Sequence, residues 1–343
     1  MRPERRRRDP PTYTEPVPDS PAPAVQIDGL VMRYGDKVAV DGLSLAVGRQ
    51  TITAVLGPNG AGKTTTLETC EGYRKPQQGR VRVLGLDPQR RRRDLLPRIG
   101  VMLQDGGAWS GVRAMEMLRH IARLHAHPLD VDLLGERLGL GDCGRTPYRR
   151  LSGGQQQRLK LAMAVVGRPE LIFVDEPTAG MDPAARRTTW GLLQEMRNDG
   201  VTVVLTTHHM DEAERLADQI HIIDRGRMIA SGTPLELTRG GTSTIRLVVT
   251  KPFPPGAPEL LQESLGHRLD VRTISEVSLL ITGPADSTTL ATVSAWCERH
   301  GVLPESLHLG QRNLEDVFLE LTGRELTGRE LAGRELTGRE LAT

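Results

Sequence analysis

The apolar and polar positions of the first 240 residues predict a sheet with helices. At 25–30 and 43–47 apolar and polar residues alternate, with a turn composition at 35–37, so an antiparallel β-layer is expected there. Short apolar runs then alternate with segments of helical period. We expect strands at 51–56, 79–84, 99–103, 171–174, 201–205 and 219–224, and helices at 112–126, 155–166, 183–198 and 210–217. This order predicts an α/β fold with a largely parallel sheet wrapped by helices.

A second, smaller α/β pattern follows a Gly- and Thr-rich segment at 233–242. Strands are expected at 244–250 and 277–282, and a helix at 286–300, which predicts an accessory domain. The segment 313–323 has the pattern of a capped amphipathic helix, and we favour a docking role for its apolar face over an ordinary core position. The predicted domains are an Arg- and Pro-rich disordered tail at 1–24, a first domain at 25–240, the accessory domain at 241–321 and a low-complexity pentapeptide tail at 322–343.

Composition and charge narrow the kinds of partner. The 343 residues carry 45 Lys and Arg against 43 Asp and Glu, and 3% are aromatic. Nucleic acid is therefore not an expected partner, because neither a strong positive field nor a set of stacking platforms is present. No apolar run approaches the roughly 18–20 residues of a membrane span, and no secretory signal is expected. Cys70, Cys143 and Cys297 lack metal-ligand spacing and fit a reducing, cytoplasmic compartment.

Residues 57–65 have the pattern of a phosphate-binding loop. They read Gly57, Pro58, Asn59, Gly60, Ala61, Gly62, Lys63, Thr64 and Thr65, between an expected strand and a helix start. The glycines let successive backbone N–H groups face phosphate oxygens, and the helix N-terminus adds its dipole. Lys63 is expected to reach the β- and γ-phosphates and the Thr64 hydroxyl to ligate Mg²⁺. The loop therefore predicts a nucleoside triphosphate site.

Two carboxylates follow the apolar run at 171–174. Asp175 and Glu176 are expected at the carboxyl edge of the sheet, where a Mg²⁺ site is commonly built. We expect Asp175 to hold the metal, directly or through water. Glu176 is expected to orient and deprotonate the attacking water.

A second anion-binding helix start is predicted at residues 151–155. The segment reads Leu151, Ser152, Gly153, Gly154 and Gln155. Ser152 is a natural N-cap, and the paired glycines leave backbone N–H groups approachable. The phosphates of one nucleotide do not need two anion-binding helix starts on the same side. The presence of both suggests that the nucleotide is sandwiched between two surfaces.

Together these motifs resemble those of the ATP-binding cassette (ABC) ATPases, over residues 25–238. The resemblance implies a P-loop NTPase cassette with a mixed, largely parallel sheet, an antiparallel β-layer and a helical subdomain. It implies ATP and Mg²⁺ as ligands. It also implies a head-to-tail dimer, in which Ser152 and Gly154 of one cassette contact the ATP that Lys63 of the other holds. Since the chain carries one cassette, a homodimer or a paired cassette is implied.

Other site residues are assigned by the same resemblance. Tyr34 is similar to the aromatic residue that stacks on adenine. Gln104 is similar to the Q-loop glutamine, which senses Mg²⁺ and couples to the membrane partner. Asp182 lies in a segment that resembles the D-loop, and His208 resembles the switch histidine that contacts the γ-phosphate. His209 is expected to be a surface or helix-start residue.

The segments 139–152 and 313–323 resemble bacterial drug-export ATPases of the daunorubicin-resistance type. This implies ATP hydrolysis coupled to drug efflux, an integral-membrane permease as a separate subunit, and a peripheral position on the cytoplasmic face of the cell membrane. The segment 106–117, with Trp109, resembles the family's coupling region. Lipid or polysaccharide export is the alternative within transport. A non-transport ABC ATPase is the alternative outside it.

Overall fold

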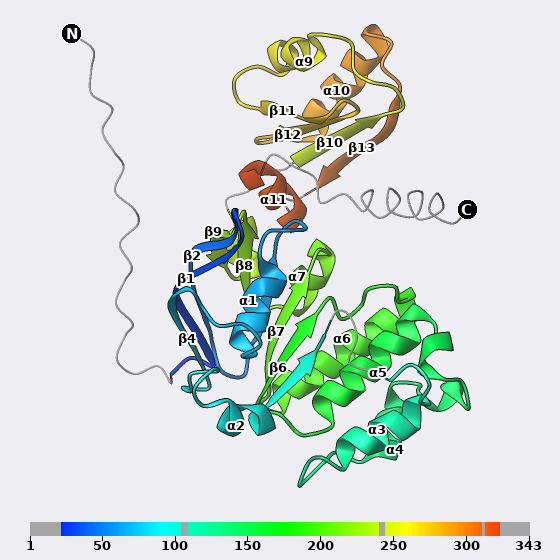
Figure 1. Ribbon diagram of the computed structural model, residues 1–343. Helices are drawn as coiled ribbons and strands as arrows, with labels where there is room; N and C mark the ends of the chain where they lie inside the picture. Colours follow the sequence, from blue (N-terminus) through cyan, green and yellow to red (C-terminus); the bar gives the residue numbers. More distant parts are fainter. Residues whose placement is uncertain (1–21, 104–108, 240–243, 311–312, 323–343) are drawn as a thin grey trace, which may run out of the picture.

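The computed structural model describes residues 22–103, 109–239, 244–310 and 313–322. Figure 1 shows a larger unit, a smaller unit, and helix α11 between them. The tails expected at 1–24 and 322–343 lie outside the described residues, except for 22–24 and Thr322. No helix in the described part of the chain is long and apolar enough to cross a membrane.

The larger unit is built on a six-stranded sheet in the order β5, β6, β7, β3, β8, β9. All neighbours are parallel except β9, which pairs antiparallel with β8. The strands are β3 (Ile52–Leu56), β5 (Ile99–Met102), β6 (Leu171–Asp175), β7 (Thr202–Thr207), β8 (Gln219–Asp224) and β9 (Arg227–Gly232). Every residue of β3, β6 and β7 is buried, as expected for strands covered on both faces. The predicted parallel sheet is confirmed.

Helices cover one face of this sheet and form the first core. The core takes Ile52, Ala54 and Leu56 from β3, because alternate residues of a strand point to opposite faces. The helices packed there include α3 (Ala114–Ala122), α5 (Gly153–Val165), α6 (Pro183–Asn198) and α7 (Met210–Leu216). Helix α4 (Val131–Arg137) contacts α3, and α3 contacts α5. Figure 1 places α3 and α4 at the end of the molecule away from the smaller unit, as a helical subdomain.

The opposite face carries the second core, which contains Val55 of β3. It is closed by α1 (Lys63–Cys70), α2 (Arg92–Leu95) and a three-stranded antiparallel sheet in the order β2, β1, β4. The strands of that sheet are β1 (Val25–Tyr34), β2 (Lys37–Val47) and β4 (Gln78–Val83). The expected antiparallel β-layer is therefore confirmed, and its place over α1 brings Tyr34 towards the phosphate-binding loop.

The smaller unit is a four-stranded antiparallel sheet with two helices. The strand order is β11 (Asp270–Ser275), β12 (Ser278–Thr282), β10 (Thr244–Val249), β13 (Pro304–Gly310). Helices α9 (Ala257–Leu265) and α10 (Ser287–Arg299) cover one face, around the fully buried Trp296. The strands and helix expected at 244–250, 277–282 and 286–300 are present. Strands β11 and β13 and helix α9 were not predicted, because they carry few buried apolar positions.

Helix α11 (Leu314–Thr322) lies on the larger unit with its apolar face. Leu314, Val317 and Phe318 are buried in the first core. The helix contacts α7 and α8 (Pro234–Thr238), and the Leu314 N–H donates to Oε1 of Glu214 at 2.5 Å. The expected docking role of this face is wrong, because the chain's own helices cover it. The face is ordinary core.

The polar side of α11 holds the smaller unit. The Thr244 hydroxyl donates to Oδ2 of Asp316 at 2.9 Å, and both side chains are buried. Arg246 donates to Oε1 of Glu315 at 3.1 Å. Thr244 and Arg246 both lie on β10. Helix α11 therefore connects the first core directly to the four-stranded sheet of the smaller unit (Figure 1).

Phe318→Ala is expected to lower the free energy of unfolding by about 3–5 kcal/mol, because truncating a buried aromatic leaves a cavity. Phe318 is 1% exposed. Urea-induced unfolding of the full chain measures the loss. Leu321→Ala, on the same helix but 46% exposed, is the control and is expected to change stability by at most about 0.5 kcal/mol. Equal losses in the two variants would contradict the packing described for α11.

Candidate functional site

A cavity of about 290 Å³ opens where the phosphate-binding loop meets the ends of the central strands. Nine of the residues singled out by sequence line it: Tyr34, Asn59, Gly60, Gly62, Lys63, Thr64, Thr65, Asp175 and Glu176. The loop leaves β3 at Leu56, and the two acids lie at the end of β6. Because parallel strands end at one edge of a sheet, residues more than 100 positions apart share this cavity.

Backbone contacts explain the glycines of the loop. A Cβ at Gly57 would clash with the carbonyl oxygen of Ile223, so the loop passes directly over β8. Gly62 has a φ of 101°, and a Cβ there would clash with the carbonyl oxygen of Ala39. Only glycine fits both the dihedral and the close approach. Gly62 caps α1 through its backbone, without a side-chain hydrogen bond.

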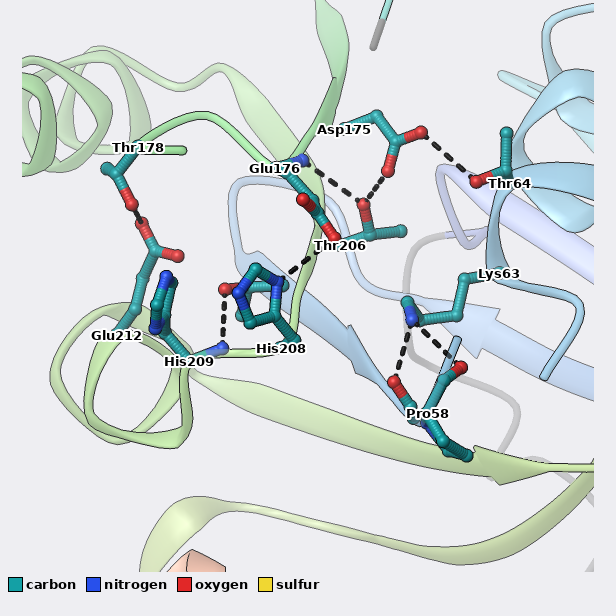
Figure 2. A network of polar contacts seen from close by, with 12 residues as sticks. Pro58, Lys63, Thr64, Asp175, Glu176, Thr178, Thr206, His208, His209 and Glu212 are labelled. Carbon is teal, nitrogen blue, oxygen red and sulfur yellow. Dashed lines mark hydrogen bonds and ion pairs between the residues drawn. The ribbon is translucent and has the colours of Figure 1, made fainter. Parts of the chain in front are cut away.

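Lys63 is buried and turned onto its own loop. Its Nζ donates to the carbonyl oxygen of Gly57 at 2.7 Å and to that of Pro58 at 3.2 Å. Burial lowers the pKa of Lys63, while the nearby carboxylates of Glu176 and Asp175 act in the opposite direction. Figure 2 shows this ammonium turned towards the loop carbonyl groups, with Asp175 and Glu176 on the other side of it. It is thus a preorganised positive group at the floor of a phosphate-sized space.

Asp175 connects three elements through its two oxygens. Oδ2 accepts from the Thr64 hydroxyl at 3.2 Å, and Oδ1 accepts from the Thr206 hydroxyl (Figure 2). Burial raises the pKa of Asp175, and these hydrogen bonds from Thr206 and Thr64 oppose the rise. Thr206 was not predicted as a site residue. It stands beside Asp175 in the β6–β7 register, which the sequence pattern does not reveal.

Glu176 is held by strand β7 and by His208. It has a φ of 49°, a left-handed conformation that a residue with a Cβ rarely adopts. Its N–H donates to the carbonyl oxygen of Thr206 at 3.0 Å. The His208 Nδ1 lies 3.0 Å from Oε1 of Glu176, and this hydrogen bond is the main cause of a lowered pKa of Glu176. His208 does not line the cavity itself, and its contact with the site is through Glu176 (Figure 2).

The histidine next to it has a different position. His209 precedes α7 as its N-cap residue, and its N–H donates to the Thr207 hydroxyl at 3.0 Å. This matches the expectation of a helix-start residue. Burial lowers the pKa of His209.

Several expected site residues are not brought into the cavity. Ser152 and Gln155 form a capping box at the start of α5, and Ser152 and Gly153 are exposed. Gly154 lies against the backbone of Gly180 and Met181. Asp182 caps α6 through the N–H groups of Ala184 and Ala185, each at 2.9 Å.

Gln104 lies outside the described residues, as does part of the expected coupling segment 106–117. Trp109 is 57% exposed, and the centroid of its ring lies 4.9 Å from that of the His120 ring.

Two cavity residues were missed at the sequence level. Lys37 and Ala39 line it beside Tyr34, at the hairpin between β1 and β2. The Tyr34 ring also carries the Arg74 guanidinium at 5.0 Å from its centroid, and Arg74 is paired with Glu68 of α1. A lysine next to a turn is an ordinary surface residue by pattern. Only the position of the hairpin over the loop makes it part of the site.

A buried acid behind the site was also missed. Glu71 is the C-cap residue of α1 and is 4% exposed, and its Oε2 has no hydrogen-bond partner among the described residues. Burial raises its pKa to about 8, and the charges of Asp175 and Glu68 act in the same direction. Its position after the polar residues of α1 gave no signal of burial.

Comparison with known proteins agrees with this geometry. The family profile described as ABC transporter matches residues 40–179. A daunorubicin resistance ATP-binding protein of Streptomyces coeruleorubidus is 37% identical over 308 residues, which cover 88% of this chain and 96% of that protein. The chain belongs to the ABC transporter family. A Nod factor export ATP-binding protein of Ralstonia nicotianae is 36% identical, and the match covers 88% of this chain and 94% of that protein.

A solved ABC structure shows a similar fold. It is cbiO1 of Clostridium perfringens, part of the ABC transporter complex cbiONQ, which is 28% identical to this chain with a TM-score of 0.56. The match covers 64% of this chain and 92% of that one. The P-loop NTPase cassette implied by the motifs is thereby confirmed. ATP binding and hydrolysis are the general chemistry of this ABC family.

Glu71→Gln is expected to flatten the pH dependence of stability. The folded chain holds a proton on Glu71 up to a pKa of about 8, whereas the unfolded chain releases it at the ordinary carboxyl pKa. Stability from this group is therefore complete below the unfolded pKa and falls as the pH rises towards 8, by at most about 1.4 kcal/mol per pH unit. Glutamine does not titrate and removes this slope, which urea unfolding at a series of pH values measures.

Glu170→Gln is the control with the opposite sign. Its hydrogen bond with Arg98 lowers the pKa of Glu170, so its contribution is present at neutral pH and lost as the pH falls through the folded pKa. This variant is expected to lose stability at neutral pH and little in acid. A slope that is unchanged in Glu71→Gln would show that Glu71 does not hold the proton.

Proposed function

We propose that this chain is the ATP-hydrolysing subunit of an ABC exporter, working as a head-to-tail dimer with a separate integral-membrane permease. The observation that carries the ATPase part is one cavity holding Lys63, Thr64, Asp175 and Glu176, with His208 on Glu176 at 3.0 Å. These are a phosphate cation, a metal-ligand pair and a water-activating acid with its partner. The same proposal divides the chain into a cassette at 25–240 and an accessory domain at 241–321, with tails at 1–24 and 322–343.

The residues present fit a magnesium ion. The Thr64 hydroxyl and the Asp175 carboxylate lie 3.2 Å apart on the cavity, and both offer hard oxygen ligands. Gln104 is assigned as a further ligand by the family resemblance. Such an ion, when bound with the nucleotide, neutralises charge on the β- and γ-phosphates.

In this proposal the chain's own groups do three things. Lys63 and the N–H groups of residues 57–65 bind the phosphates, and Tyr34 supports adenine from the side of the cavity where it is 42% exposed. Glu176, kept anionic by its hydrogen bond with His208, orients water and accepts its proton. His208 keeps Glu176 in place and contacts the γ-phosphate when nucleotide is bound.

The second half of the site comes from a partner cassette. Ser152 caps α5 and Gly153 begins it, and both are exposed outside the cavity, so this helix start can face another molecule. We assign Ser152, Gly153, Gly154 and Gln155 to the ATP held by the partner, with Asp182 beside them. Two cassettes then close around two nucleotides, and loss of the γ-phosphate reopens them.

Export and membrane location rest on the relatives. Drug efflux is favoured because a daunorubicin resistance protein matches over nearly its whole length. Lipid or polysaccharide export is the second candidate, because a Nod factor export protein matches almost as well. In both cases the chain would lie on the cytoplasmic face of the membrane and reach the permease near Gln104 and Trp109.

Lys63→Ala is expected to weaken ATP binding at least about tenfold, because a charged hydrogen-bond donor to phosphate contributes about 1.5–3 kcal/mol. Titration with a fluorescent ATP analogue measures the affinity. Arg90→Ala removes a cation outside the cavity and is expected to bind as the wild type does. Unchanged affinity in Lys63→Ala would contradict the phosphate-loop assignment.

Glu176→Gln is expected to keep ATP binding, abolish turnover and trap a closed dimer, because the amide cannot accept the proton of water. The chain is expressed with its candidate permease in membranes, and Mg-ATPase activity is measured with and without cytotoxic compounds. Stimulation of Glu176-dependent activity by a compound supports drug export. Activity that is indifferent to permease and compounds would favour a non-transport ABC ATPase.

A further inference from the structure

A buried carboxylate lies behind the site, on the helix that follows His208. Glu212 is in the first turn of α7 and is 0% exposed. Its Oε1 accepts from the Thr178 hydroxyl at 3.0 Å and from Trp190 Nε1 at 2.9 Å. Its Oε2 has no hydrogen-bond partner among the described residues. Burying a carboxylate that is only half satisfied costs stability, so a purely structural role would be better served by a neutral group.

The partners of Glu212 lie on both sides of the segment that resembles the D-loop. Thr178 stands two positions after Glu176, and the Ala179 N–H donates back to the Glu176 carbonyl oxygen at 3.2 Å. Trp190 lies on α6, which begins at the Asp182 cap. Glu212 thus contacts the first residue of the segment 178–182 and the helix that follows this segment.

Two hydrogen bonds therefore join residues 176–178 to residues 208–212, one beside the cavity and one in the core. At the cavity, His208 contacts Glu176; in the core, Glu212 contacts Thr178 (Figure 2). The first contact lies where the γ-phosphate is expected. The second is sealed from solvent, since Thr178 is 1% exposed. A shift of His208 towards a phosphate would pull the start of α7, and the Glu212 hydrogen bond would pass that shift to Thr178.

We propose that Glu212 is a positioning residue that couples the switch histidine to the segment 178–182, so that nucleotide binding in one cassette reorders the segment placed beside the partner. The inference rests on the proposed function for the location of the γ-phosphate and of the dimer surface. Glu212 touches no substrate in this account. It acts through Thr178, while Trp190 keeps its carboxylate in place.

Thr178→Val tests the coupling, because it removes the hydroxyl and keeps the shape. ATP affinity is expected to stay within about twofold of wild type, since Thr178 is outside the cavity, while kcat falls about tenfold. In the Glu176→Gln background, hydrogen exchange is measured with and without ATP. The wild-type sequence at 178 should show ATP-induced protection at 178–182 and in α7, and Thr178→Val should keep only the protection in α7. Thr178→Ser restores the hydroxyl and should restore both.

Thr244→Val is the matched control. It removes another buried threonine hydroxyl from another buried carboxylate, that of Asp316 at 2.9 Å, in a contact between β10 and α11 rather than between α7 and the segment 178–182. It should leave kcat and the exchange pattern as in the wild type. Equal losses of kcat in Thr178→Val and Thr244→Val, or unchanged protection at 178–182 in Thr178→Val, would overturn the coupling. Absence of Glu176-dependent turnover in the wild type would instead overturn the proposed function, while the exchange comparison still decides the coupling.

Discussion

The site depends on one shared hydrogen-bond acceptor, the carboxylate of Asp175. Thr64 at the start of α1 donates to one oxygen, and Thr206 near the end of β7 donates to the other. The phosphate-binding loop, β6 and β7 are therefore held at fixed distances before any ligand arrives. Because Thr206 also accepts the Glu176 N–H through its carbonyl oxygen, the strained conformation of Glu176 is held by the same strand.

Asp175, Glu176 and Glu71 are acidic side chains of this region, and their surroundings shift their pKa values in different directions. Burial raises the pKa of Asp175 and Glu71, whereas the His208 hydrogen bond lowers that of Glu176. Lys63 is the nearby cation, and its own burial lowers its pKa. The opposite shifts follow from different surroundings, since Asp175 is buried beside two hydroxyl groups and Glu176 contacts an imidazole. Glu71 protonated behind them relieves the repulsion that a third carboxylate would add.

Sequence patterns predicted the elements whose signals are local. The loop at 57–65, the acids at the end of β6 and the cap of α5 each follow from a short stretch, so their positions agree with the structure. The residues missed are those whose role depends on register or on the packing of distant segments. Thr206, Lys37 and Glu212 look like ordinary strand, turn and helix residues until β6 meets β7, the hairpin crosses the loop, and α7 packs on α6.

Helix α11 is a second case in which the sequence predicts a local pattern but not the surface that packs on it. Its apolar stripe was correctly predicted, but a stripe does not say which surface covers it, and the structure places it on α7, the helix that carries Glu212. Glu214 of α7 accepts the Leu314 N–H, and Asp316 on the other side of α11 holds Thr244 of the smaller unit. Helix α7, which follows His208, thus contacts Thr178 through Glu212 and α11 through Glu214. Glu212 and Glu214 are two positions apart, so one short helix turns one acid towards Thr178 in the core and the other towards α11.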